Sequence, residues 1–139
     1  MKNTVIKYQV IMFIVMVIVG MLFNPMNMLA YKFSHLYLST TLFYGGLLMA
    51  SNMMWAHEIV HYLSMGHLNK KIFLLGIVLS CFCVFLLRQQ VIVSPKQWLK
   101  RMIPHHSTAL TTTNKLIKNN KTKENPELFR LAKDIIDTQ

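Results

Sequence analysis

The sequence has few acidic residues, few cysteines and no strand-like alternation of apolar and polar side chains. Five Asp and Glu stand against fifteen Lys and Arg, and Glu58 is the sole acid before Ser94. Cys81 and Cys83 lie two residues apart on an expected helix and point to different sides, which argues against a C-x-x-C motif and a disulfide. Without strand-like alternation, the architecture is predicted to be all-α.

Apolar residues are concentrated before Val93 in a chain of 139 residues that is 53% hydrophobic and 14% charged. This uneven distribution is not typical of a soluble domain and predicts a transmembrane region at 1–93, with the lipid bilayer as its partner. Three transmembrane helices are expected, at about 8–31, 36–65 and 72–90. The first resembles a signal peptide, but no A-x-A-like cleavage site follows it. An uncleaved helix that is kinked or frayed near Pro25 is therefore favoured.

The second apolar segment, 36–65, is longer than a bilayer requires. At about 1.5 Å per residue it reaches roughly 45 Å, against a hydrocarbon core of ~30 Å, so it must tilt or protrude. Gly46 and Ala50 lie four residues apart on it, a spacing typical of closely packed helices in lipid. Self-association through this face would make the protein a homo-oligomer, and a structural or assembly role without metal is the corresponding alternative.

Residues 94–139 form a more polar C-terminal domain. Ser94 and Pro95 predict a helix start, and Asn125 with Pro126 predicts a second one after a loop at 119–125. Apolar residues at amphipathic spacing make the two helices a hairpin. Its lysines are not interleaved with aromatic residues, so nucleic-acid binding is not expected, and attraction to anionic lipid headgroups is favoured.

The second apolar segment also contains His57-Glu58-Ile59-Val60-His61, the H-E-x-x-H pattern of zinc metalloproteases. Met53, His57, His61 and Met65 recur every four residues, and thioether and imidazole donors suit Cu(I), whereas imidazole alone also suits Zn²⁺. These four residues are a candidate second metal site. Glu58, if embedded in the bilayer, is costly and needs a partner for its charge.

A zinc protease also needs a third protein ligand and room for water and a substrate carbonyl. The remaining acids all lie in the C-terminal domain, and His35 lies in a loop. We therefore treat a membrane zinc protease as the weaker alternative and favour a non-enzymatic function.

A second histidine cluster lies in the sequence MIPHH of the C-terminal domain. On a helix, Met102 and His106 are four residues apart and face the same way, and His105 lies three residues from Met102. These three side chains could form a soft-metal site. Pro104 removes a backbone donor and is expected to bend the helix beside them.

Two segments of this domain resemble the family called domain of unknown function 305. They are 98–110 (WLKRMIPHHSTAL), with the M-I-P-H-H signature, and 127–139 (ELFRLAKDIIDTQ), with an L-A-x-x-I-I-x-x-Q helix. The upstream stretch 35–49 (HLYLSTTLFYGGLLM) resembles membrane-anchored members. The sequence departs from the pattern at Thr112, where many relatives have methionine, and relatives continue their second helix beyond the position of Gln139.

The resemblance implies a ferritin-like helical half-bundle that binds copper through Met102, His105 and His106. It also implies that the hairpin lies outside the cytoplasm. The Lys and Arg counts on the two sides of the membrane are nearly balanced, so the positive-inside rule alone does not fix the orientation. Together, these features predict a small multi-pass integral membrane protein that binds or buffers a transition metal, copper in the first place and zinc as the alternative.

Overall fold

The computed structural model describes residues 2–119 and 125–139. This part of the chain is helical and contains no strand, which confirms the all-α prediction. The loop expected at 119–125 lies mostly outside the described residues. The elements, in chain order, are α1 Lys2–Leu22, α2 Pro25–Met28, the 3₁₀ helix η1 Phe33–His35, α3 Thr40–Met65, α4 Lys70–Arg88, α5 Pro95–Lys118 and α6 Pro126–Thr138.

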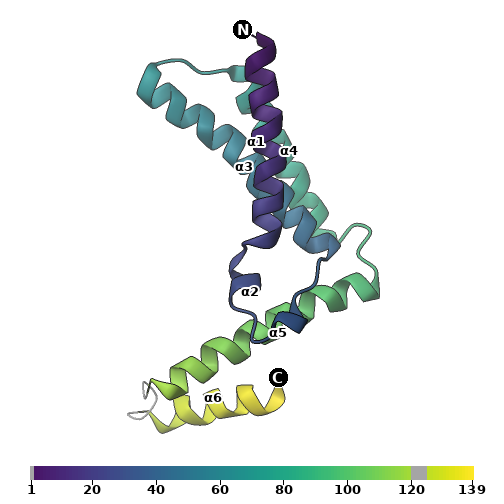
Figure 1. Ribbon diagram of the computed structural model, residues 1–139, viewed down its shortest axis with the longest axis vertical. Coiled ribbons are helices and arrows are strands. Elements are labelled where there is room, and N and C mark those ends of the chain that lie inside the picture. The colour runs from purple at the N-terminus through teal and green to yellow at the C-terminus, as the bar shows by residue number, and fades with distance from the viewer. Residues whose placement is uncertain (1, 120–124) are drawn as a thin grey trace.

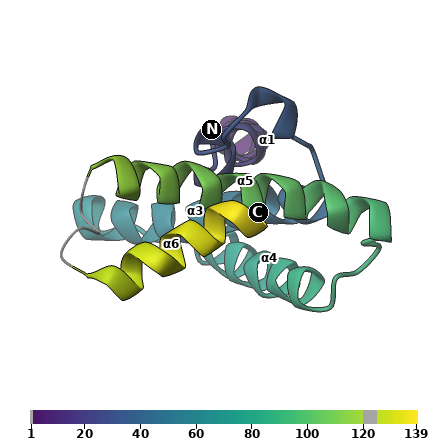
Figure 2. The same ribbon diagram turned by 90° about the horizontal axis from the view of Figure 1, so that it is seen from below.

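The helices form two layers (Figure 1). Helix α3 runs obliquely past α1 and packs against both α1 and α4. The N-terminus and the connection between α3 and α4 lie at one end of this bundle, and α2, α5 and α6 lie at the other. Figure 2 shows that α5 and α6 lie side by side across that end.

The first expected helix, 8–31, is broken in the structure. Helix α1 ends at Leu22, and the short α2 begins at Pro25. Proline has no N–H to continue the ladder. The side chain of Asn24 accepts the N–H of Asn27 at 3.1 Å and caps α2, while Nδ2 of Asn27 donates to the carbonyl of Met21 at 2.8 Å. The two asparagines thus satisfy backbone groups that the break would leave unpaired.

Helix α3 begins four residues later than expected, because Ser39 caps it by accepting the N–H of Leu42 at 3.1 Å. It ends at Gly66, which has a left-handed φ of 69° and donates its N–H to the carbonyl of Tyr62. Glycine adopts this conformation without the steric cost that other residues meet. The 26 residues extend over about 39 Å at 1.5 Å each.

Two stretches, Thr4–Met28 and Lys70–Arg88, are long and apolar enough to cross a membrane. In the apolar 18-residue segment of each stretch, only 11% and 17% of the residues are buried within the chain, whereas the core helices of a soluble protein are mostly buried. Helix α3 is long enough to cross a membrane but not apolar enough, because polar residues such as Asn52, His57 and Glu58 lower its mean hydropathy. By length and composition, the described chain therefore has two candidate membrane-spanning helices and not the three expected.

The small residues of α3 lie where α1 packs against it. A Cβ added to Gly46 would come within 2.9 Å of the carbonyl oxygen of Val17, and one added to Gly20 within 3.2 Å of the Cα of Gly46. Ala50 is buried on the same face. Because this face is covered by α1 of the same chain, a homo-oligomer would have to use another surface.

Candidate metal sites

The MIPHH segment lies in the middle of α5. Ser94 caps this helix by accepting the N–H of Gln97, and Pro95 occupies its first turn. The helix continues through Pro104, whose ring is fully buried. Since proline has no N–H, the carbonyl of Lys100 loses its usual helical partner. The expected bend thus does not interrupt the helix between Pro95 and Lys118.

Ser107 fastens α5 to the connector between α1 and α3. Its buried Oγ accepts the N–H of Tyr31 at 2.7 Å and lies 2.9 Å from Nδ1 of His35. One residue later, Oγ1 of Thr108 donates to the carbonyl of Met26 at 3.2 Å. These contacts bring His35, 72 residues away along the chain, to the histidine-bearing helix.

His35, Met102 and His106 line one cavity of about 320 Å³, together with Trp98, Leu99, Ile103, Ser107, Leu110 and Gln139. The structure thus brings together two of the three ligands that the sequence predicts and adds His35. His105 lies outside this lining; it is exposed, with its ring centroid 5.6 Å from that of His106. Adjacent residues on a helix point about 100° apart, which explains why the two imidazoles diverge.

Gln139 orients the imidazole of His106. Its Oε1 accepts a hydrogen bond from Nδ1 of His106. An amide oxygen can only accept, so Nδ1 carries the proton and Nε2 keeps a free lone pair. The glutamine at the end of α6 therefore holds this histidine in the tautomer that can bind a metal through Nε2.

Exposed basic residues lie along α5 and α6; they are Lys96, Lys115, Lys118, Arg130 and Lys133. Arg101 neighbours Met102, and its half-buried guanidinium has a pKa below its usual value because burial disfavours the charged form. The side chains of Trp98 and Leu99 on α5 are more than half exposed, and so is that of Leu131 on α6. The hairpin therefore presents apolar and basic groups outward together.

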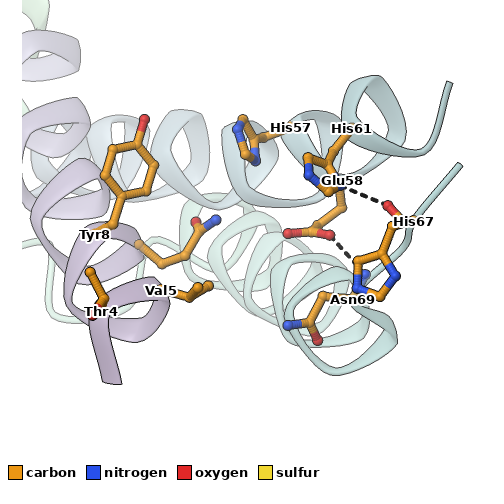
Figure 3. A pocket seen from close by; sticks show the side chains of 9 residues that line it. Thr4, Val5, Tyr8, His57, Glu58, His61, His67 and Asn69 are labelled. Carbon is orange, nitrogen blue, oxygen red and sulfur yellow. Dashed lines mark hydrogen bonds between the residues drawn. The ribbon is translucent and has the colours of Figure 1, made fainter. Parts of the chain in front are cut away.

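The H-E-x-x-H segment lies at the opposite end of the bundle, in a cavity of about 430 Å³ (Figure 3). This cavity lies between the start of α1, the second half of α3 and the connector 66–69. Its lining residues are Thr4, Val5, Tyr8, Gln9, His57, Glu58, His61, His67 and Asn69.

Glu58 is 5% exposed, and its Oε2 accepts the backbone N–H of Asn69 at 2.9 Å. The partner expected for this charge is thus a backbone amide of the connector. The contact holds the connector against α3, as Figure 3 shows. Hydrogen bonds to a carboxylate are among the stronger ones, so this contact stabilises the turn between the helices.

Three histidines line this cavity together with Glu58. The ring centroids of His57 and His61 are 6.3 Å apart, and those of His61 and His67 are 6.0 Å apart. Nδ1 of His61 donates to the carbonyl of His67 at 2.8 Å, which leaves Nε2 of His61 as an acceptor. Within the described residues, neither Nδ1 of His57 nor Oε1 of Gln9 has a hydrogen-bond partner, although both atoms are buried.

The methionines predicted for this second site lie elsewhere. Met53 and Met65 are 40% and 74% exposed and do not line the cavity that His57 and His61 share. In the part of the chain that the structure describes, no three His, Cys, Asp or Glu residues are grouped so as to hold a metal ion. The soft-metal ladder along α3 is therefore not assembled in the structure.

His67 and Gln9 are absent from the sequence-based prediction of this site. A signal for His67 exists: it follows His61 by six residues, as the third histidine does in the pattern H-E-x-x-H-x-x-G-x-x-H. Ser64 replaces the glycine of that pattern, and Gly66 makes the turn instead. Gln9 has no such signal, because only the packing of α1 on α3 places it in the cavity.

Comparison with known proteins gives one informative relative. A protein of Acanthamoeba polyphaga mimivirus, the uncharacterized protein L153, is 33% identical over 118 residues, which cover 84% of this chain and 74% of the viral protein. No known family profile matches the chain. No solved structure matches it either.

Proposed function

This chain belongs to the same family as the mimivirus protein, and we propose that it is a small integral membrane protein that binds copper through its C-terminal hairpin. The observation that supports this most is the cavity shared by His35, Met102 and His106. It combines a thioether with two imidazoles, a donor set that suits Cu(I).

Met102 and His106 supply the first two ligands from successive turns of α5. Residues four apart on a helix are neighbours, so a thioether and an imidazole can reach one ion. His35 supplies the third ligand when its Nδ1–H donates to Ser107, because that tautomer leaves Nε2 free. Gln139 supports His106 from the outer shell.

The proposal also explains why two distant motifs resemble the domain of unknown function 305. The M-I-P-H-H signature and the terminal glutamine of the second helix meet at the hydrogen bond between His106 and Gln139. His105, which the resemblance also implies as a ligand, lies on the exposed side of α5. In this proposal it receives the ion before the ion enters the cavity or holds it afterwards.

In the membrane, we propose that α3 crosses the bilayer between α1 and α4 as the third spanning helix. Its length of about 39 Å is sufficient for a tilted crossing. The hairpin then lies on the membrane surface, with Trp98, Leu99 and Leu131 at the level of the headgroups, on the extracytoplasmic side. Cysteines introduced by Thr4→Cys and Lys118→Cys, with Cys81 and Cys83 changed to serine, should then react with impermeant reagents from opposite sides.

The copper proposal is tested by Cu(I) titration of the purified full chain against a competing chelator. We expect one ion per chain, an affinity at least tenfold lower in His106→Ala, and a smaller loss in His105→Ala. His67→Ala, at the other end of the bundle, is the matched control and should leave the affinity unchanged. A chain that takes up no copper would favour the structural role without metal, and equal uptake after His106→Ala would show that copper does not bind in this cavity.

A further inference from the structure

We propose that a groove between α1 and α4 binds one anionic phospholipid, at the end of the bundle opposite the hairpin. Two adjoining cavities form this groove: a mouth of about 690 Å³ beside the connector 66–69, and an apolar part of about 290 Å³. Ile6, Ile72 and Leu75 line both cavities. The groove meets lipid only when the chain lies in a membrane, so this inference rests on the proposed function.

The walls of the groove are apolar and uncovered. Helices α1 and α4 both pack on α3, whereas they have little contact with each other. Ile6, Val10 and Leu75 are more than half exposed, and Met54 of α3 contributes to the lining of the apolar part. The two helices that form the walls belong to the two stretches that are long and apolar enough to cross a membrane. A hydrocarbon chain of the bilayer fits such a strip.

The apolar part runs from the mouth along both helices in the same direction. Helices α1 and α4 begin at the end of the bundle where the N-terminus and the connector lie (Figure 1). At 1.5 Å per residue, the stretches from Ile6 to Phe13 and from Ile72 to Leu79 each rise about 10 Å. All four of these residues line the apolar part. An acyl chain can therefore lie along both helices while its headgroup stays at the mouth.

The mouth of the groove carries positive charge. Exposed Lys70 and Lys71 line it together with His67, and none of the described lining residues is acidic. The two lysines occupy the first turn of α4, where the helix dipole and the N–H groups without an intrahelical acceptor also favour an anion. Basic pockets between transmembrane helices bind anionic lipid headgroups in this way.

The acid of the neighbouring cavity does not line the mouth. Glu58 is 5% exposed, and its Oε2 already accepts the N–H of Asn69. Its carboxylate therefore points into the bundle and leaves the exposed lysines for a ligand.

An unsatisfied amide in the groove is a second, independent indication of a ligand. Gln9 is 7% exposed, and its Oε1 has no hydrogen-bond partner within the part of the chain that the structure describes. The residue lines the apolar part of the groove, where an unpaired amide is costly. In a phospholipid, ester carbonyls lie between the phosphate and the acyl chains. When the amide of Gln9 turns by half a rotation, its Nε2 can donate to such a carbonyl.

Native mass spectrometry of the full chain in detergent, with added dioleoylphosphatidylglycerol or dioleoylphosphatidylcholine, tests the headgroup. We expect one phosphatidylglycerol per chain, bound at least tenfold more tightly than phosphatidylcholine. Lys70→Gln/Lys71→Gln should lower that affinity at least tenfold, because each lysine near a lipid surface contributes roughly fivefold. Lys115→Gln/Lys118→Gln removes two exposed lysines from α5, is the matched control and should leave the affinity unchanged.

A second pair of variants tests the apolar part. Val10→Trp fills it from an exposed position of α1 and should lower the affinity at least tenfold. Val15→Trp makes the same change at a position of α1 that is 50% exposed and lines neither cavity, so it should bind lipid as the parent does. Inorganic phosphate should not displace the lipid, because it lacks the acyl chain.

Equal retention of the two lipids, equal losses in the two lysine pairs, or displacement by inorganic phosphate would overturn the inference. Retention in detergent does not depend on the topology that cysteine labelling tests. The copper affinity of Lys70→Gln/Lys71→Gln should equal that of the parent. The lipid site can therefore fail while the proposed function holds, and the reverse.

Discussion

Gly46→Ala is expected to weaken the packing of α1 on α3, whereas Gly45→Ala on the next residue is not. A Cβ on Gly46 would lie 2.9 Å from the carbonyl oxygen of Val17 and 3.0 Å from the side chain of Met21. The first of these atoms belongs to a backbone and cannot turn aside, so the helices must separate. A Cβ on Gly45 meets no atom of the described chain within 4 Å.

The free energy of unfolding should separate the two variants clearly. Alanine in place of glycine stabilises a helix interior by about 0.5–1 kcal/mol, and both variants share this gain. Overpacking costs about 1–3 kcal/mol and applies to Gly46→Ala alone. Gly46→Ala should therefore be about 1–3 kcal/mol less stable than Gly45→Ala.

The assay is unfolding of the full chain in mixed micelles by increasing denaturing detergent, followed by far-ultraviolet circular dichroism. Gly45→Ala serves as the reference because it carries the same added methyl group on the same helix. If Gly46→Ala proves as stable as Gly45→Ala, α1 does not pack on this face. Loss of a dimer in Gly46→Ala at unchanged stability would instead assign the face to contact between two copies.

Three further substitutions test the two sites. Ser107→Ala removes the hydroxyl that binds Tyr31 and His35, between α1 and α3, to α5. The free energy of unfolding should therefore fall by about 1–3 kcal/mol, and copper should bind more weakly because His35 is no longer held in place. Gln139→Ala should lower copper affinity roughly 10–100-fold, because His106 loses its outer-shell partner, and an unchanged affinity would remove that role. Glu58→Ala leaves the N–H of Asn69 without its acceptor and should lower the free energy of unfolding by about 1–3 kcal/mol. The control Glu58→Gln keeps an oxygen that can accept, so its free energy of unfolding should be close to that of the parent.

Local chemistry made several features predictable from the sequence. Helix α5 begins where Ser94 caps it and Pro95 occupies its first turn. Helix α6 begins in the same way at Asn125 and Pro126. The break near Pro25 follows from a missing N–H. Each of these depends on residues within one helical turn, so no knowledge of the tertiary structure is needed.

Other features depend on contacts between distant segments. His35 lies near Met102 and His106 only because Ser107 binds the segment between α1 and α3. A serine in an amphipathic helix does not reveal such a contact in the sequence. Gln9 enters the second cavity only through the packing of α1 on α3. Apolar length alone made 36–65 resemble α1 and α4, but polar residues of α3 lower its hydropathy below theirs, so two candidate spans stand out in the structure.

The central claim is that copper binds to the thioether of Met102 and the imidazoles of His106 and His35, which line one cavity. X-ray absorption at the copper edge of the Cu(I)-loaded full chain tests it most directly, with Met102→Leu as the variant because leucine nearly conserves the volume and removes the sulfur. The account predicts one sulfur and at least two nitrogen neighbours in the parent, and nitrogen alone in Met102→Leu. A parent spectrum without sulfur, or a sulfur signal that survives Met102→Leu, would contradict it.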